Sequence, residues 1–499
     1  MQKGKRRKEQ WIWREGTEGN CIPKTNVILI VSDQHRFCDV GYMGNEIVAT
    51  PNLDFMAEHG VVMENTYSCC PLCVPARGTI FTGLHALKHG AAANDMPVLQ
   101  DVPSVPKCLS GAGYSIGLVG KWHLGGVPRE KAIPKDERLG FEYWRGCNCN
   151  HEYLKGWYDD DENHRYKIEG YEPVGQTNLA LEFLEKKKDE SFFLSLCFGP
   201  PHDPYFELPE GALARFAGKD IPLRENAVNQ KIKDFTLRGK NLKEQYAGYY
   251  AQISQLDIQI GRVLEWLKAS GHEKDTIVIY TSDHGDMLGS HGFANKQIWY
   301  EESAHIPCVF YGPGLEPGRR KGVFSLLDLA PTIAGLCGVE MSGTDGRDLS
   351  SYVKSPSGKK QEYVYFYSYV PCHQASLRRV KSWRAVTDGR YKLVADDKRR
   401  VQGFYDLEED PLELTDFREA KEKQADLTRL FEVLDREVAE HDGYRPYLEL
   451  LKEHGILSAW LESERHFYQI WTFIPKVVRK LKMRRINRTE KKMLRGESN

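Results

Sequence analysis

The sequence predicts an α/β protein whose large domain has a mostly parallel central sheet flanked by helices, followed by a smaller C-terminal domain with an antiparallel sheet. Four short apolar segments indicate the large sheet: residues 26–32, 115–120, 191–198 and 276–282. Their hydrophobic residues are continuous rather than alternating, as expected for strands covered on both faces. Polar and charged residues follow each segment, at the edge where parallel α/β sheets bind ligands.

A long helix is predicted between the third and the fourth of these strands. Apolar residues from Leu242 to Leu267 recur every three or four positions, and Gly271 is a typical helix end. Asp257 lies within this pattern, and we expect it to have a structural rather than a catalytic role.

The C-terminal part of the chain has a different pattern. Segments 383–387 and 390–394 flank Asp388-Gly389, which is a strong signal for a β-hairpin, and residues 363–370 are a further strand candidate. The chain is therefore expected to divide into four parts, which are a basic N-terminal extension (1–24), a large α/β domain (25–350), an antiparallel subdomain (351–445) and a helical basic tail (446–499). We interpret the tail as a solvated segment or a lid helix, because runs of charge more often form solvated faces than membrane or nucleic-acid contacts.

The composition is that of a globular protein. Of 499 residues, 41% are hydrophobic and 28% are charged, which excludes collagen, coiled-coil and wholly disordered chains. The net charge of −1 gives no overall field that would attract nucleic acid. The longest aliphatic run, 27–31, is far shorter than the ~20 residues of a membrane span, and we recognise no signal peptide. With 12 cysteines and no export signal, we expect reduced thiols in the cytoplasm.

One cysteine-rich stretch, residues 69–83, contains the candidate nucleophile. Cys70 and Cys73 have the spacing of a redox C-x-x-C pair, but nothing else in the chain is thioredoxin-like and no second pair completes a zinc site. Pro75 suits the first turn of a helix and Gly83 its end, which places Cys73 at a helix N-terminus. The free N–H groups and the dipole of such a terminus favour an anion, and Arg77 lies one turn further on. This pattern is typical of a nucleophile that faces a tetrahedral oxyanion.

Several motifs resemble those of a single enzyme family, and they follow one another along the chain in the family's order. CVPAR at 73–77, followed by Thr82-Gly83, resembles the signature of the type I sulfatases, in which the cysteine is oxidised to Cα-formylglycine; GKWHLG at 120–125 resembles their second signature. The resemblance continues at 32–34, 201–204, 282–285 and Lys296. It covers roughly residues 25–440. It implies the fold of the alkaline phosphatase-like superfamily, with the catalytic domain at 25–350.

The resemblance implies a divalent cation held by Asp33, Gln34, Asp283 and His284, together with the formylglycine that derives from Cys73. The implied ion is Ca²⁺, which carboxylate and amide oxygens suit. The family's commonest pattern has a second Asp in place of Gln34 and often Asn in place of His284. An imidazole ligand leaves Mn²⁺ open, and Mg²⁺ is a further alternative.

The resemblance also implies a role for each remaining motif residue. A formylglycine hydrate in place of the cysteine would attack the sulfur and form a covalent sulfated intermediate, and its return to the aldehyde would release sulfate. Arg77 and Lys121 match the residues that hold the hydrate and the sulfate charge, and His123 matches the base that takes a proton from the hydrate. His202 and Lys296 match the pair at the bridging ester oxygen, where the leaving alcohol needs a proton.

Two loop segments are weaker candidates. Cys147, Cys149 and His151 have a spacing that a metal site could use, but nothing in the sequence completes such a site. Asn94 and Asp95 lie in another segment that could line a pocket.

We therefore predict a sulfuric ester hydrolase, a sulfatase, that acts on a sulfated sugar or a small-molecule sulfate. The alternative is a phosphonate monoester or phosphodiester hydrolase of the same superfamily, because the Gln34/His284 pair resembles members of both kinds. A third interpretation is a non-catalytic binding protein, against which the intact set of motif residues argues. The expected partners are a small sulfated substrate and a formylglycine-generating maturation enzyme, with no nucleic acid and no transmembrane segment. The sequence does not indicate an oligomeric state.

Overall fold

The larger of two sheets has ten strands and contains all four of the buried strands that the sequence predicts. The computed structural model describes residues 24–227, 234–470 and 476–494, so the predicted N-terminal extension lies outside the described residues except for Lys24. In spatial order the strands are β10 (Gly318–Ser325), β2 (Val61–Tyr67), β9 (Cys308–Tyr311), β8 (Thr276–Ser282), β1 (Asn26–Ser32), β7 (Phe192–Cys197), β3 (Ser115–Lys121), β4 (Tyr143–Cys147), β5 (Trp157–Asp159) and β6 (Arg165–Lys167).

The four predicted strands are β1, β3, β7 and β8, and they are neighbours in the order β8-β1-β7-β3. Every pairing among them is parallel, with Ser32 of β1 opposite Ser282 of β8. The pairings of β9 with β2 and β8, and of β5 with β4 and β6, are antiparallel. The prediction of a mostly parallel sheet is confirmed, and the carboxyl ends of its central strands meet at one edge.

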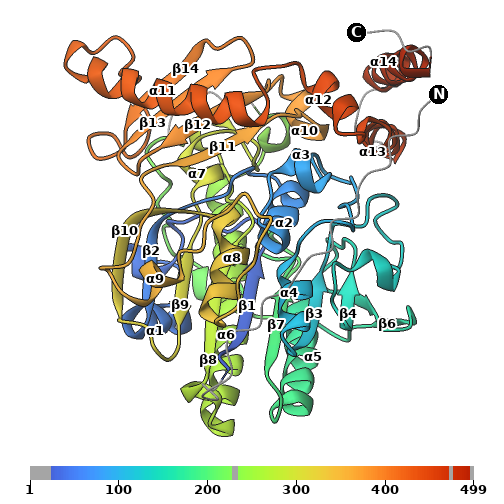
Figure 1. Cartoon of the computed structure of the whole chain (residues 1–499), viewed down its shortest axis with the longest axis vertical. Coiled ribbons are helices and arrows are strands. Elements are labelled where there is room, and N and C mark those ends of the chain that lie inside the picture. The colour runs from blue at the N-terminus through green and yellow to red at the C-terminus, as the bar shows by residue number, and fades with distance from the viewer. Residues whose placement is uncertain (1–23, 228–233, 471–475, 495–499) are drawn as a thin grey trace.

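Helices cover both faces of this sheet (Figure 1). On one face, α2 (Cys73–Thr82), α4 (Val105–Gly111) and α8 (Leu326–Leu336) share a hydrophobic cluster with alternate residues of β1. On the other face, α1 (Pro51–His59), α5 (Glu172–Lys187) and α6 (Leu242–Ser270) share a cluster with the intervening residues of β1. Short helices within the loops are α3 (Ala86–His89), α7 (Glu301–Ala304), α9 (Ser350–Lys354) and α10 (His373–Leu377).

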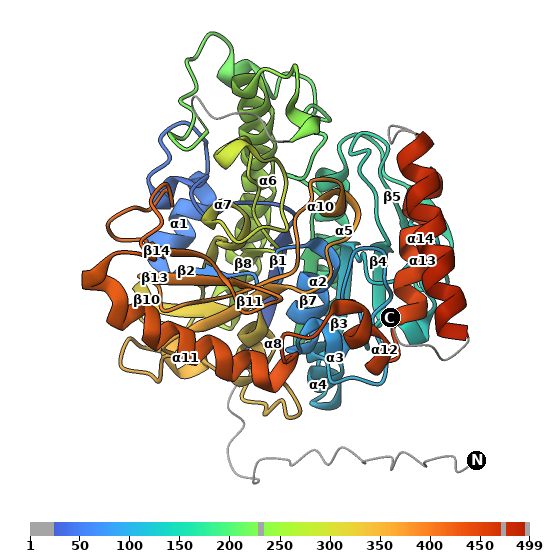
Figure 2. The ribbon, with the colours of Figure 1, turned by 90° about the horizontal axis from the view of Figure 1, so that it is seen from above.

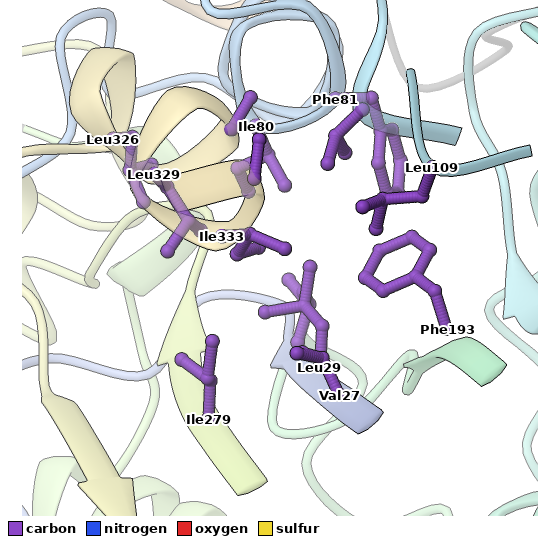
Figure 3. Close-up of a cluster of buried hydrophobic side chains, with 14 of the residues drawn as sticks. Val27, Leu29, Ile80, Phe81, Leu109, Phe193, Ile279, Leu326, Leu329 and Ile333 are labelled. Carbon is purple, nitrogen blue, oxygen red and sulfur yellow. The ribbon is translucent and has the colours of Figure 1, made fainter. Parts of the chain in front are cut away.

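The position of α2 is fixed by packing against the centre of the sheet. Figure 3 shows Ile80 and Phe81 of this helix on the side that faces Leu29 of β1, with Ile333 of α8 nearby. All ten residues of α2 are buried, and the helix ends at Gly83, whose φ of 63° favours a residue without a side chain. The predicted helix with Cys73 at its N-terminus is confirmed.

The predicted long helix is α6, which Gly271 caps in the left-handed conformation with a φ of 77°. Its Asp257 has the structural role that the sequence predicts. The Oδ1 atom accepts a hydrogen bond from the backbone N–H of Leu53 at 2.8 Å, and Oδ2 accepts one from that of Asn52 at 3.1 Å. Both donors belong to the first turn of α1, where helix N–H groups have no intrahelical acceptor. Asp257 therefore joins α1 to α6.

A second, four-stranded sheet follows in the chain and is antiparallel throughout. Its strands, in spatial order, are β11 (Val364–Ser368), β12 (Trp383–Thr387), β13 (Tyr391–Asp396) and β14 (Val401–Asp406). The predicted hairpin at Asp388-Gly389 joins β12 to β13, and α11 (Gln424–His441) packs on this sheet (Figure 2). The sheet lies inside the predicted segment 351–445, whose limits stay a prediction.

The C-terminal segment contains α12 (Tyr447–Glu453), α13 (Leu457–Ile470) and α14 (Lys476–Leu494). Because α13 buries Trp460, Leu461 and Phe467, the description of a solvated tail does not fit this helix. Figure 2 shows α13 and α14 next to each other at one flank of the molecule. Among the helices of the described ranges, none is both long and apolar enough to cross a bilayer. The described cysteines are free thiols.

Replacing Asp257 with Ala should lower the free energy of unfolding by about 1–3 kcal/mol, because two N–H groups at the start of α1 lose their acceptor. Urea denaturation of the two proteins measures the difference. The matched control is Glu265→Ala, an exposed position on the same helix, which should change stability by less than about 0.5 kcal/mol. Equal losses in the two variants would contradict the structural role of Asp257.

Candidate active site

Four side chains that could hold a metal ion meet where β1 and β8 end. Asp33 follows β1, Asp283 and His284 follow β8, and Cys73 begins α2. One ligand atom from each residue lies within 4.8 Å of the others, and all four residues are buried. The parallel register of the two strands brings the two carboxylates together, and the packing of α2 against the sheet adds the cysteine.

The Cys73 sulfur lies within this group. Its Sγ is 3.1 Å from His284 Nε2 and 3.8 Å from Asp33 Oδ1. His284 Nδ1 lies 2.9 Å from the carbonyl oxygen of Gly285, which places a ring proton on Nδ1. The Nε2 atom is therefore directed into the group, where it can serve as a ligand once it carries no proton. Burial lowers the pKa of His284, but the charges of Asp283 and Cys73 raise it above its usual value.

Two cations neutralise the paired carboxylates. Lys121 Nζ lies 2.7 Å from Asp33 Oδ2, and Arg77 Nε donates to Asp283 Oδ2 at 3.0 Å. Burial tends to raise the pKa of Asp33, but Lys121 and other nearby cations hold that pKa well below its usual value. Burial, together with the negative charge of Asp33, raises the pKa of Asp283. Arg77 and Lys121 are thus held by the charges at the base of the site.

The donor set fits a divalent cation. The two carboxylates suit Ca²⁺ or Mg²⁺, the imidazole nitrogen leaves Mn²⁺ open, and the four buried residues converge closely enough to share one ion. An ion held here would polarise the oxygens of a bound anionic ester.

Gln34, the further ligand that the sequence predicts, has a different environment. Its Oε1 accepts a hydrogen bond from Lys296 Nζ at 2.5 Å, and its Nε2 donates to Asp286 Oδ2 at 2.7 Å. Its backbone N–H donates to Asp283 Oδ1 at 3.1 Å. The structure therefore brings Gln34 to the site as a link between Lys296 and Asp286, and its assignment as a metal ligand stays a prediction.

His123 lies in a group of charged side chains on another side of the site. Its Nε2 is 3.3 Å from Asp95 Oδ1, which also accepts from Arg129 Nε at 2.8 Å. Burial lowers the pKa of His123, but the charge of Cys149 and the bond to Asp95 raise it to about 10. Burial raises the pKa of Cys149, but His123, Lys121 and Arg129 lower it to about 6. While Cys73 is an unmodified cysteine, His123 is therefore a cation at neutral pH.

The pair predicted at the leaving oxygen is close together in the structure. His202 Nε2 lies 2.6 Å from Lys296 Nζ, and His202 Nδ1 lies 2.6 Å from the carbonyl oxygen of Asp203. The contact of Nδ1 with a carbonyl oxygen places a proton on that nitrogen. The Nε2 atom then accepts a hydrogen bond from the Lys296 ammonium group, and the two side chains form one unit.

His151 joins this pair to the rest of the site, although the sequence indicated it only as a weak loop candidate. Its ring stacks on His202 with centroids 4.3 Å apart, and its Nε2 lies 3.2 Å from Lys121 Nζ. Burial, together with the charges of Lys121 and His202, holds the pKa of His151 well below its usual value. A neutral His151 can accept from Lys121, and it links the Lys121–Asp33 pair to the His202–Lys296 pair.

Cys73, His123, His151, His202 and Lys296 line a cavity of about 110 Å³, whose lining does not include Asp33, Asp283 or His284. Its charged and ionisable lining is mostly basic and includes His123, Arg129, His151, His202, Lys296 and Arg378, with Asp203 as the acidic member. Four lining residues come from outside the predicted catalytic domain: Cys372, Ala375 and Arg378 lie in or next to α10, and Phe467 belongs to α13. The sequence carried no local signal for these four residues, because they reach the cavity only through the docking of C-terminal segments.

The weaker cysteine and histidine candidate does not form a metal centre. Cys149 Sγ lies 3.5 Å from His151 Nε2, but within the described part of the chain this pair belongs to no group of three metal-ligating side chains. A second group of that kind does exist, formed by His291, Glu302 and Glu413. The carboxylates of that group are paired with protein cations, so its charge is balanced within the chain.

Comparisons with known proteins agree with this geometry. Residues 25–339 match the family model described as Sulfatase, which covers more than half of the chain. The chain belongs to the sulfatase family. Residues 289–440 of this sulfatase also match the family model described as N-sulphoglucosamine sulphohydrolase, C-terminal.

The sulfatase is similar to proteins from several bacteria. It is 32% identical over 344 residues to the ulvan-active sulfatase of Formosa agariphila, in an alignment that covers 67% of this chain and 66% of that protein, just under two thirds of it. It is 28% identical over 493 residues to an arylsulfatase of Clostridium perfringens, covering 87% of this chain and 98% of that protein. The crystal structure of the Bacteroides fragilis protein yidJ has a TM-score of 0.73 at 25% identity, covering 87% of this chain and 99% of that chain.

Family membership confirms the predicted alkaline phosphatase-like fold and the predicted enzyme class, a sulfuric ester hydrolase. The two matched regions contain all of the predicted site residues, from Asp33 to Lys296. Phe467 and the whole of α13 lie beyond residue 440, outside both matched regions. One part of the cavity wall therefore comes from a segment that lies outside both matched regions.

Removal of divalent cations by a chelator should abolish sulfate ester hydrolysis, and adding a divalent cation back should restore it. Asp283→Ala should weaken metal binding more than Gln34→Ala does, because it removes a charged ligand. Calorimetric titration of metal into each stripped protein measures the affinities, with Glu265→Ala as a remote control. Equal activity in metal-free and reloaded protein would refute a metal role.

Proposed function

We propose that this sulfatase hydrolyses the sulfate ester of a sugar or of a small molecule, using a formylglycine that derives from Cys73 and a divalent cation. The observation that carries the proposal is the position of Cys73 at the N-terminus of α2, among Asp33, Asp283 and His284 and on the wall of a basic cavity. The cation would be held by the two carboxylates and the imidazole, with Ca²⁺ as the proposed ion.

The cavity suits an anionic substrate. Six of its lining side chains are basic and one is acidic, although one of the six, His151, is neutral. Backbone N–H groups at the start of α2 add positive potential on the same side, because a helix N-terminus carries a partial positive charge. A sulfate ester is a monoanion, and this lining would hold its charged end toward Cys73 while the alcohol part extends toward the cavity opening.

The sulfur of Cys73 stands in for the hydroxyl oxygen of a formylglycine hydrate. Such a hydrate supplies a nucleophilic oxygen, and its collapse to the aldehyde releases sulfate without attack of water on sulfur. The resemblance assigns His123 as the base that accepts the hydrate proton. In the thiol form His123 is a cation, which holds negative charge near Cys73, so the base role requires that this proton first be lost. The modification would be made in the cytoplasm by a maturation enzyme that recognises residues 73–77.

His202 and Lys296 would act at the ester oxygen that leaves. Lys296 Nζ lies 2.6 Å from His202 Nε2 and 2.5 Å from Gln34 Oε1, so its position is fixed from two sides. Both side chains line the cavity that contains Cys73. A proton delivered from this pair would neutralise the alkoxide as the bond to sulfur breaks.

Cys73→Ala should leave the fold intact and abolish turnover, because alanine cannot be converted to formylglycine. The matched control is Cys70→Ala, a buried cysteine three residues earlier, which should keep its turnover. Peptide mass analysis of the protein from its native host should find position 73 modified. Substantial sulfatase activity in Cys73→Ala, or a wholly unmodified thiol in an active protein, would refute this assignment; an unmodified thiol in an inactive protein would support a binding protein without catalysis.

His202→Ala should affect substrates according to the basicity of their leaving groups. A sugar or alkyl alkoxide needs a proton to depart, whereas a nitrophenolate leaves almost unaided. The variant should therefore lose about 10²–10⁴-fold in kcat/KM on an alkyl or sugar sulfate and much less on nitrophenyl sulfate. Equal losses on both substrates would mean that His202 binds sulfate, and the acid would then be Lys296.

The alternative function is hydrolysis of a phosphonate monoester or a phosphodiester, which the Gln34/His284 pair also allows. Both substrate classes are anions that the basic lining would accept, so the contacts at the site do not separate them. Values of kcat/KM measured side by side on a sulfate ester and on a phosphonate ester with the same leaving group decide the matter. A clear preference for the phosphonate ester would replace our proposal.

A further inference from the structure

The outer surface of α14 carries a row of cations. Its 19 residues include nine Lys or Arg and one Glu, whereas the whole chain has a net charge of −1. Residues spaced three or four apart share one face of a helix. The exposed basic residues with this spacing are Lys476, Lys480, Arg484, Arg488 and Lys491. Within the described ranges, no ion pair involves a member of this row, whereas Glu490 pairs with Arg465 of α13.

Two apolar side chains lie beside the cation row. Val477 is 70% exposed and Leu481 is 59% exposed, and they are one turn apart on the helix. The opposite face of α14 is covered, because Ile486 is buried and Val478 and Met483 pack against the C-terminal hydrophobic cluster. The helix is therefore held on the protein by one face and presents cations and apolar side chains together to solvent, at the flank seen in Figure 2.

This outer face is unfavourable for a helix that meets only water. Like charges at i and i+4 repel each other, and large apolar side chains prefer burial. A surface that is negatively charged and apolar underneath would remove both penalties, because its headgroup phosphates bind Lys and Arg while the apolar side chains enter the acyl boundary. A soluble polyanion would neutralise the cation row but would leave Val477 and Leu481 exposed.

We propose that the cation row and the adjacent Val477 and Leu481 dock this sulfatase onto a lipid surface rich in anionic headgroups. The helix would lie in the plane of the surface and would not span it. Among the described residues, none from α14 lines the active-site cavity, so docking is separable from hydrolysis. The proposal is therefore independent of the substrate and of the maturation of Cys73.

Co-sedimentation of the full chain with vesicles tests the proposal. The protein should bind vesicles of phosphatidylcholine mixed with phosphatidylglycerol, should not bind phosphatidylcholine alone, and should dissociate as salt is raised. The triple variant Lys480→Gln, Arg484→Gln, Arg488→Gln should lose about 10²-fold in partition constant, at about fivefold for each cation. The matched control, Lys186→Gln, Lys187→Gln, Lys188→Gln, neutralises three adjacent lysines at the C-terminal end and cap of α5 and should bind as the parent does.

Leu481→Gln separates a lipid surface from a soluble polyanion. It should weaken vesicle binding several-fold, because it removes an apolar side chain that enters the acyl boundary. Thermal melting and hydrolysis of a small aryl sulfate should match the parent in every variant, which excludes unfolding as the cause. The proposal is overturned by absence of binding to the anionic vesicles or by equal losses in the two triple variants. It is also overturned if Leu481→Gln binds vesicles unchanged, or if dextran sulfate is bound more tightly than the vesicles.

Discussion

The burial of two carboxylates side by side is the constraint on which the rest of this structure depends. In-register parallel pairing of β1 with β8 places Asp33 and Asp283 next to each other, and both side chains are fully buried. Ligand atoms of the two carboxylates lie within 4.8 Å of each other. Two negative charges this close in a low-dielectric interior are unfavourable unless cations lie against them. Arg77 and Lys121 supply those cations from α2 and from the end of β3. The position of α2 on the sheet is therefore set by charge as well as by apolar packing.

The same ion pairs begin a chain of contacts that reaches across the cavity. Lys121 contacts His151, His151 stacks on His202, and His202 accepts from Lys296, which in turn donates to Gln34. Each side chain in this series is held by a contact with the next one. A site arranged in this way needs little reorganisation when an anion enters, and fixed dipoles and charges stabilise developing charge better than mobile ones.

Much of this arrangement could be predicted from the sequence because its signals are local. A continuous apolar run that ends in a polar residue predicts a buried strand and places that polar residue at the edge of the sheet. The segments before Asp33 and Asp283 both have this pattern. The helix that begins at Cys73 followed from one proline and one glycine. Arg378 and Phe467 could not be predicted, because only tertiary docking brings them to the cavity. The same holds for the charge state of His123, which depends on Cys149, a residue distant in the sequence.

The order of these elements along the chain has a consequence for timing. Cys73 is synthesised early, but Asp283 and His284, which close around it, come about 200 residues later. At ribosomal rates of about 5–20 residues per second, this delay is on the order of 10–40 s. Until β8 emerges and pairs with β1, the segment around Cys73 has neither of these two neighbours. Under the maturation proposed above, the modifying enzyme must therefore reach Cys73 before β8 has been made and packed, because the completed fold buries the cysteine.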